Sequence, residues 1–340
     1  MLLFLRYFTM RRKVISLIII CLLISCKTIT TPIIYDKNQK SLDNNIKIMT
    51  QLLLDKKYEA LERELFRFLT IYKDNEDLLL LKGWLLLQTK KYKEAEAIFL
   101  SLLEKNKKNL LCYAGLARLY RIQNKKDLAE QKISEALKVN QFFSIIWFEK
   151  GMLEYENREY EKAIISFTRA INIDYKNYDA KFFRYLCYLK TGRELDDVKD
   201  IWESIVKAGI LKPEYFLYHA YTLYEIEKYK SFSLIVLKDG LNKFPDDPYL
   251  LNMYSYLLFE KYKESRDEKY LIEAKESIVK CFDIAKNIEI EFVDTYLVIL
   301  KEIKDYQKMK ELINEYYLLY PDSDIIKFWL KESNLQGGEN

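Results

Sequence analysis

Histidine is the residue most often used in general acid-base catalysis and metal binding, and this sequence contains very little of it. His219 is the only histidine among 340 residues, so neither an HExxH motif nor a site with several histidines can be formed. A serine nucleophile would depend on this one histidine, and the glycines of a nucleophile elbow are missing. We therefore expect His219 to be a buried structural residue of a helix.

The cysteines beyond the N-terminal segment also lack a chemical pattern. Cys112, Cys187 and Cys281 are far apart, and no two of them have CxxC spacing. Their odd number argues against a complete set of intrachain disulfides. We expect three small, buried apolar side chains.

Three pairs of neighbouring carboxylates fall at predicted turns or helix starts. An acidic side chain at such a position complements the positive end of the helix dipole, and we favour this role over acid-base catalysis. The pairs are Asp196-Asp197, Asp246-Asp247, and Glu289 with Glu291. The sequence therefore predicts a protein that is not an enzyme and that holds no metal or cofactor.

Residues 1–25 have the composition of an export signal. A basic cluster at 11–13 precedes an apolar run at 14–24, and this run is too short to span a bilayer, which takes about 20 residues. The run closes with Leu23-Ile24-Ser25-Cys26, which resembles the bacterial lipobox. That resemblance implies cleavage before Cys26 and attachment of lipid to this cysteine. An uncleaved anchor helix is the alternative, and Met10 is a second candidate for the start.

The segment 26–41 is polar and lacks a helical pattern, so we expect a tether. Lys27 directly follows Cys26. In the enterobacterial sorting rule an aspartate at this position retains a lipoprotein at the inner membrane, so the absence of aspartate here favours the outer membrane. The formal charge of +4 belongs to the export signal, because the chain from Cys26 onward has 51 basic and 51 acidic residues. A chain without excess positive charge gains no broad attraction to nucleic acid, and we expect no nucleic-acid partner.

A repeat of 34 residues organises the remaining chain. Small or apolar residues recur at this spacing and then at steps of 35, 42 and 35: Leu61, Ala95, Ala129, Ala163, Asp197, Phe232, Ala274 and Met309. An apolar residue follows each of them by four, and a small residue precedes several of them by twelve, at Gly83, Ala117, Gly151 and Ala220. Such spacings place residues on one face of a helix. Each repeat is therefore predicted to be a helical hairpin whose small residue lets the second helix approach closely.

The repeat is similar to the tetratricopeptide pattern W-x2-L-G-x2-Y followed by Y-x2-A-x3-F-x2-A. Its best match in this sequence is Trp147, Gly151, Tyr160, Ala163, Phe167 and Ala170. The resemblance covers about residues 42–322, or eight repeats, and implies an all-α, right-handed superhelical solenoid. The scarcity of glycine (8) and proline (5) also argues against a fold with many strands. We expect a capping helix and a frayed tail at 323–340.

The sequence departs from the repeat pattern in several places. Asp197 replaces an alanine, and larger residues occupy the small position in three repeats, at Met49, Tyr185 and Leu297. The segment 207–213 is the predicted bend of the stack. Seven extra residues near 263–268 are expected to lengthen the seventh hairpin or to protrude.

The resemblance also implies a binding surface on the first-helix face that lines the concave side. In this sequence that face consists of Trp84, Leu87, Arg118, Arg121, Phe148, Met152, Tyr155, Phe182, Tyr221, Tyr224, Asn252, Tyr256 and Phe259. Its aromatic side chains can anchor an extended peptide or a helix, and its two arginines can pair with a partner's carboxylates. Packing within the repeats is the alternative role for each of them.

These observations predict a non-catalytic scaffold or adaptor that is held at a bacterial envelope membrane by a lipid on Cys26. Its partners would be other envelope proteins, which present peptide or helix segments to the concave face. Two alternatives stay open: a subunit of an envelope enzyme complex, in peptidoglycan metabolism or outer-membrane assembly, and a surface adhesin.

Overall fold

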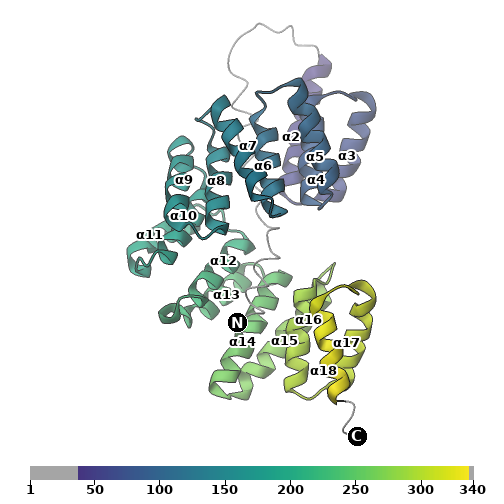
Figure 1. The fold of residues 1–340 in the computed structure, drawn as a ribbon, viewed down its shortest axis with the longest axis vertical. Helices are drawn as coiled ribbons and strands as arrows, with labels where there is room; N and C mark the ends of the chain where they lie inside the picture. Colours follow the sequence, from purple (N-terminus) through teal and green to yellow (C-terminus); the bar gives the residue numbers. More distant parts are fainter. Residues whose placement is uncertain (1–36, 337–340) are drawn as a thin grey trace. The chain divides into compact units, whose positions relative to one another are not determined.

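The computed structural model describes residues 37–336 and, within them, the side chains of residues 41–332. This range contains seventeen α-helices, α2 to α18, and one 3-10 helix, η1, and it contains no strand. Successive helices form antiparallel pairs (Figure 1). The all-α prediction is confirmed. The described chain divides into two compact units between Ile210 and Leu211, within the segment 207–213, and each unit is treated separately below. The predicted export signal, Cys26 and most of the tether lie outside the described residues.

The N-terminal unit consists of five helical hairpins. Turns of three or four residues join the two helices of each hairpin, and each first helix also contacts the first helix of the next hairpin. The hairpins are α2 (Lys37–Leu54) with α3 (Tyr58–Ile71), α4 (Glu76–Gln88) with α5 (Tyr92–Lys105), α6 (Leu110–Ile122) with α7 (Lys126–Val139), α8 (Ser144–Glu156) with α9 (Tyr160–Ile173), and α10 (Tyr178–Lys190) with α11 (Leu195–Lys207).

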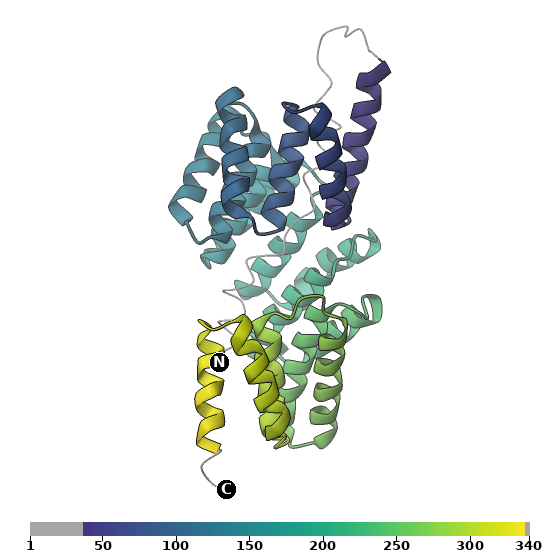
Figure 2. The ribbon, with the colours of Figure 1, turned by 90° about the vertical axis from the view of Figure 1, so that its right-hand side faces the viewer.

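The C-terminal unit consists of three hairpins and a final helix. They are α12 (Pro213–Tyr224) with η1 (Glu227–Tyr229) and α13 (Phe232–Lys243), α14 (Pro248–Ser265) with α15 (Glu268–Ile284), α16 (Ile290–Glu302) with α17 (Tyr306–Leu319), and α18 (Asp324–Gln336). In Figure 2 the last helix, in yellow, lies beside α17. Helices α14 and α15 contain 18 and 17 residues, so the extra residues of the seventh repeat lengthen its hairpin.

The final helix covers the end of the last hairpin, as predicted. Ile325, Ile326 and Trp329 of α18 are buried, and the Trp329 indole N–H donates to Asp294 at 2.7 Å. Phe328 of the same helix is instead exposed. It directly precedes Trp329, and neighbouring residues of a helix do not share a face.

The hairpin turns of the N-terminal unit share one backbone conformation. Lys56, Lys90, Asn124 and Arg158 have φ between 57° and 66°, and Gly192 has φ 88°. In each turn the amide of the next residue bonds back to the carbonyl five positions earlier, as between Lys91 and Leu86 at 2.9 Å. This is the Schellman ending of a helix. The four non-glycine residues adopt a left-handed conformation that costs roughly 1–2 kcal/mol each.

Several first helices begin at a residue whose side chain caps them. Asn75, Asn109 and Asn177 each accept the amide hydrogen three residues later, and Asp247 accepts two amides of α14. Such caps satisfy backbone donors that have no partner within the helix. The predicted role of the Asp246-Asp247 pair is confirmed at Asp247.

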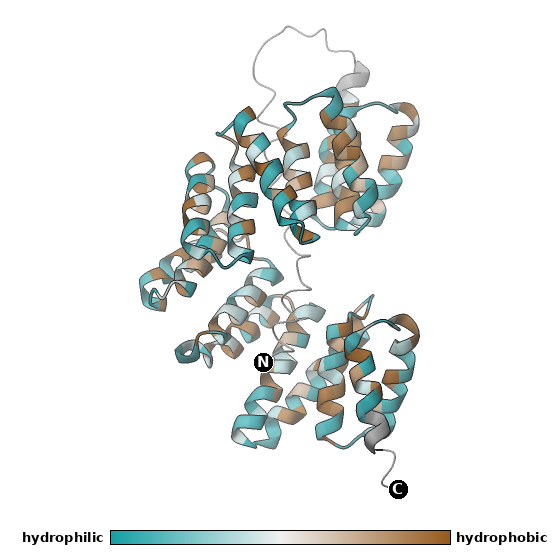
Figure 3. Cartoon of the chain, in the orientation of Figure 1, coloured by the Kyte–Doolittle hydropathy of each residue, from teal (hydrophilic) through white to brown (hydrophobic). Residues whose placement is uncertain are grey.

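Glycines in the first helices make room for phenylalanines of the second helices. A Cβ at Gly83 would lie 2.7 Å from the Phe99 ring, and a Cβ at Gly151 would lie 2.6 Å from the Phe167 ring. Phe99 also touches the next hairpin, where a Cβ at Gly115 would lie 2.6 Å away. The predicted close approach is therefore confirmed. The helices carry both hydrophobic and hydrophilic residues, whereas the turns between them are mostly hydrophilic (Figure 3).

Candidate functional site

The residues of the predicted concave face all lie on first helices, but most of them are covered. Trp84 and Leu87 lie on α4, the two arginines on α6, Phe148, Met152 and Tyr155 on α8, Phe182 on α10, Tyr221 and Tyr224 on α12, and Asn252, Tyr256 and Phe259 on α14. Eleven of these thirteen side chains are buried. Tyr224 and Tyr256 keep intermediate exposure.

The two arginines of this face bind carboxylates that the chain itself supplies. Arg118 Nε donates to Glu149 Oε1 at 2.8 Å, and Arg121 Nη2 donates to Glu149 Oε2 at 3.2 Å. A second carboxylate, Glu156, pairs with Arg121 Nη1. Glu149 is fully buried, and both arginines are nearly so. In this structure the network links α6 to α8, where the sequence suggested a partner's carboxylates.

The aromatic members of the N-terminal unit pack against other rings of the same unit. Trp84 meets Phe99 edge-on, with ring centroids 5.6 Å apart. Phe148 contacts Phe183 at 6.2 Å, and Phe183 also contacts Tyr155 at 5.4 Å. These side chains form the core between successive hairpins. Their direct contact with a partner stays a prediction, and their observed contribution is packing.

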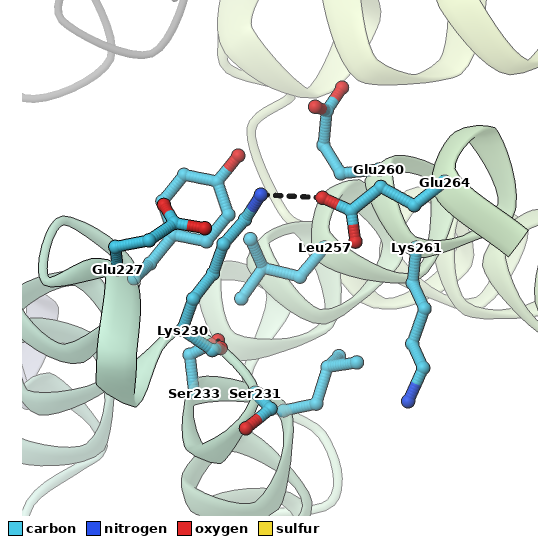
Figure 4. A pocket seen from close by; sticks show the side chains of 10 residues that line it. Glu227, Lys230, Ser231, Ser233, Leu257, Glu260, Lys261 and Glu264 are labelled. Carbon is cyan, nitrogen blue, oxygen red and sulfur yellow. Dashed lines mark hydrogen bonds and ion pairs between the residues drawn. The ribbon is translucent and has the colours of Figure 1, made fainter.

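The C-terminal unit holds an open pocket beside the two tyrosines. Its volume is about 340 Å³, and residues from the end of α12, the η1 turn, α13 and α14 line it. Tyr224, Glu227, Lys230, Glu260 and Glu264 contribute its polar walls. In Figure 4 the Lys230 side chain reaches toward Glu264 across this space. This is the part of the predicted face that stays accessible.

Charges in the pocket are arranged around Lys230. Its ammonium donates to Glu264 Oε1 at 2.5 Å and lies 5.3 Å from the centre of the Tyr224 ring. The bond to Glu264 raises the pKa of Lys230. Burial, and after it the negative charge of Glu260, raises the pKa of the Tyr224 hydroxyl. The same two causes, in the same order, raise the pKa of Tyr256, which is hydrogen-bonded to Tyr224.

The isolated catalytic residue types behave as the sequence predicted. His219 is buried, and burial lowers its pKa to about 3, so it is neutral at physiological pH. Cys112, Cys187 and Cys281 are buried and are not joined in disulfides, and burial raises the pKa of Cys112 to about 12. Buried thiols with raised pKa are poor nucleophiles. Among residues 37–336, no group of three or more His, Cys, Asp and Glu side chains is arranged to hold a metal ion.

The 34-residue repeat pattern did not indicate the pocket or Glu149. The pocket combines a 3-10 turn with two helices, and this turn interrupts the regular repeat. Glu149 follows Arg118 by 31 residues, outside the 34-residue register. A search for opposite charges on neighbouring first helices would have found Glu149. None of the helices within the described range has the length and apolar character required to cross a bilayer.

Comparisons with known proteins agree with this architecture. Family models described as tetratricopeptide repeat match residues 76–109 and 115–193. The N-terminal unit therefore contains tetratricopeptide repeats, and the whole described chain has the all-helical fold of such solenoids. Human protein IFIT1 homolog B is 31% identical over 94 residues, which cover 26% of this chain and 20% of that protein. The chain thus spans about a fifth of the curated relative.

Two solved structures show the same type of fold. The chain is similar to yeast Tom70, with a TM-score of 0.64 and 14% identity over 92% of this chain and 67% of that one. It is also similar to a tetratricopeptide repeat protein from Parabacteroides merdae, with a TM-score of 0.50 and 18% identity over 76% and 98% of the two chains. At these identities the likeness concerns the fold alone.

Proposed function

We propose that this protein is a non-catalytic scaffold that is anchored by lipid on Cys26 in a bacterial envelope, where it holds other envelope proteins. Stacked helical hairpins offer an extended binding surface, and tetratricopeptide repeats generally mediate protein–protein interaction. The observation that carries the envelope part of the proposal is the Leu23-Ile24-Ser25-Cys26 motif behind a short apolar run.

The position of the first described helix fits this arrangement. Helix α2 begins at Lys37, eleven residues after Cys26, and eleven residues extend at most about 40 Å. A lipid on Cys26 would therefore hold the first hairpin close to the membrane surface. Two acyl chains on one residue give stable attachment. The outer membrane is our preferred location because Lys27 stands where the retention signal of the sorting rule would be.

Lipid attachment is tested by growing cells with an alkyne analogue of palmitate. The intact chain should become labelled and stay with membranes after an alkaline carbonate wash, whereas Cys26→Ala should lose both properties. Cys112→Ala, which removes a buried thiol in α6, is the matched control and should keep both. Labelling that survives in Cys26→Ala would refute the anchor.

The scaffold role is tested by crosslinking in living cells followed by mass spectrometry. We expect envelope proteins to be joined to the described helices in the wild type, and we expect these crosslinks to disappear in Cys26→Ala. Crosslinks that are unaffected by release from the membrane would contradict the proposed location. A turnover activity of the purified protein that is lost on replacing a carboxylate would favour an enzyme instead.

A further inference from the structure

The chain from Cys26 onward is formally neutral, but its two units differ in charge. Residues 26–210 contain 33 basic and 27 acidic residues, whereas residues 211–340 contain 18 basic and 24 acidic residues. The C-terminal unit is therefore acidic, and its field attracts cations over roughly a Debye length, about 8–10 Å at physiological salt. The pocket lies within this acidic unit.

Three carboxylates and one aromatic ring form the binding groups of the pocket. Glu227 comes from the η1 turn, Glu260 and Glu264 lie one helical turn apart on α14, and Tyr224 ends α12. Carboxylates on the wall and an aromatic face beside them are the combination that holds an ammonium or a guanidinium. Leu257 adds an apolar contact for the methylene stem of such a side chain.

The two lysines of the pocket leave room for a further cation. The Lys261 ammonium lies 4.7 Å from the centre of the Tyr270 ring, and Figure 4 shows it pointing away from the carboxylates. Lys230 is bound to Glu264. Glu260 accepts one hydrogen bond from Lys263 at 2.8 Å, and a carboxylate has about four acceptor positions. Acceptor positions therefore remain on the wall formed by Glu227 and Glu260.

Lys230 shows how the pocket binds a cation. Its ammonium contacts one carboxylate and one aromatic face at the same time, and its side chain is 29% exposed. Its bond to Glu264, a largely exposed side chain, is a surface ion pair, and such pairs stabilise by only about 0–1 kcal/mol. Lys230 can therefore move aside at small cost. A guanidinium is planar and forms two parallel hydrogen bonds with a carboxylate, which a lysine cannot do. An arginine from outside can therefore use these groups better than Lys230 does.

We propose that the pocket lined by Tyr224, Glu227, Glu260 and Glu264 receives an arginine or lysine side chain of a partner protein, in competition with the internal Lys230. This inference rests on the proposed role as a protein scaffold and adds the chemistry of the segment that is bound: a basic one. The raised pKa of Tyr224 and Tyr256 agrees with it, because Glu260 contributes to both shifts. Both hydroxyls stay protonated at physiological pH, so the tyrosines add no charge of their own.

The test measures binding of a fluorescein-labelled peptide of alternating glycine and arginine to the full chain in a non-ionic detergent. Peptides with glutamine or glutamate in place of arginine are the comparison. We expect fluorescence anisotropy to report saturable binding of the arginine peptide only. Equal binding of the glutamine peptide, or no binding of the arginine peptide, would overturn the proposal.

Two pairs of variants separate the pocket from the general charge of the unit. Glu227→Gln with Glu260→Gln should weaken binding by about tenfold, the loss expected for one charge-assisted hydrogen bond. Glu276→Gln with Glu311→Gln makes the same change of charge at exposed sites of α15 and α17 and should change affinity less than about twofold by screening. Equal losses in the two pairs would assign binding to net charge and refute the pocket.

Lys230→Met gives the sharpest result, because it removes the internal competitor. We expect it to tighten binding of the arginine peptide by several-fold, whereas Lys261→Met should have a smaller effect. Unchanged or weaker binding in Lys230→Met would refute the competition. Circular dichroism confirms that each variant keeps its helices, and Lys230→Gln replaces Lys230→Met if that variant fails to fold. The assay does not depend on lipid attachment, so loss of the anchor and loss of the pocket are observed independently.

Discussion

Replacement of Glu149 by glutamine tests whether the charge network between α6 and α8 stabilises the N-terminal unit. The carboxylate is fully buried and faces the guanidinium groups of Arg118 and Arg121. Glutamine keeps the shape but removes the charge, which leaves two nearly buried cations with Glu156 as the remaining carboxylate of the network. Breaking a buried ion pair in this way costs about 3–5 kcal/mol. The opening equilibrium of this region should rise by a factor of roughly 10² to 10³ or more.

Hydrogen exchange with mass spectrometry measures this effect locally, which matters because a chain of two units need not unfold in one transition. We expect faster exchange in peptides from α6 and α8 and unchanged exchange in α14 to α18. A variant with methionine at 118, 121 and 149 should recover most of the protection, because apolar residues often replace buried ion pairs without loss. Unchanged exchange in Glu149→Gln would refute the reasoning. So would a methionine variant that is less protected than the single variant.

Three further substitutions test the packing, the caps and a buried carboxyl. Gly151→Ala should lower stability by about 1–3 kcal/mol, because it forces a Cβ against Phe167. Adding Phe167→Leu to this variant should restore part of the melting temperature. An unchanged melting temperature in Gly151→Ala alone would contradict the contact. Asn75→Ala should cost about 1–2 kcal/mol in denaturant unfolding, because the side chain caps α4, and an equal effect of Asn75→Asp would argue against capping. Burial raises the pKa of Glu154 in the folded protein. Protonation of Glu154 therefore favours folding at low pH. This contribution to stability is lost as the pH rises from the ordinary glutamate pKa through the raised pKa. The stability of Glu154→Gln relative to the wild type should therefore be higher at pH 7 than at pH 4. A stability difference that is the same at both pH values would refute this reasoning.

The 34-residue register predicted the hairpins because it records a size relation between two helices. Where the small position is glycine, the residue sixteen positions later is phenylalanine, as in Gly83 with Phe99 and Gly151 with Phe167. In the fifth repeat the register is shifted by one residue from the prediction, because Asp197 is exposed and Val198 and Ile205 are the buried residues of α11. In the sixth repeat Phe232 is likewise exposed, and Ser233 and Leu237 are buried. Tyr185 is fully buried and stacks on Trp202. The size relation therefore holds for the glycine–phenylalanine pairs, whereas the fifth repeat packs two large aromatic side chains against each other.

The candidate site was predicted only in part, for reasons that concern single side chains. The sequence placed the thirteen residues on the correct helices, but periodicity cannot tell whether a helix face is covered by its neighbours. Burial of Trp84 and Phe148 depends on rings from other helices, and the arginines depend on Glu149. The pocket depends on the η1 turn, which places Lys230 beside Tyr224. Such contacts depend on tertiary structure and leave no period in the sequence.

The lengthened hairpin of α14 and α15 implies a rule for the size of tolerated insertions. A helix must gain a whole turn, about 3.6 residues, for the residues beyond the insertion to return to the same face. A hairpin has two helices, so an addition of one whole turn to each of them needs about seven residues. The seventh repeat exceeds its neighbours by seven residues. We expect insertions of seven or fourteen residues at other hairpin turns of this chain to leave the flanking helices folded. An insertion of two residues is about half a helical turn and would rotate the residues beyond it to the opposite face, so the tolerated lengths of these repeats should be discrete.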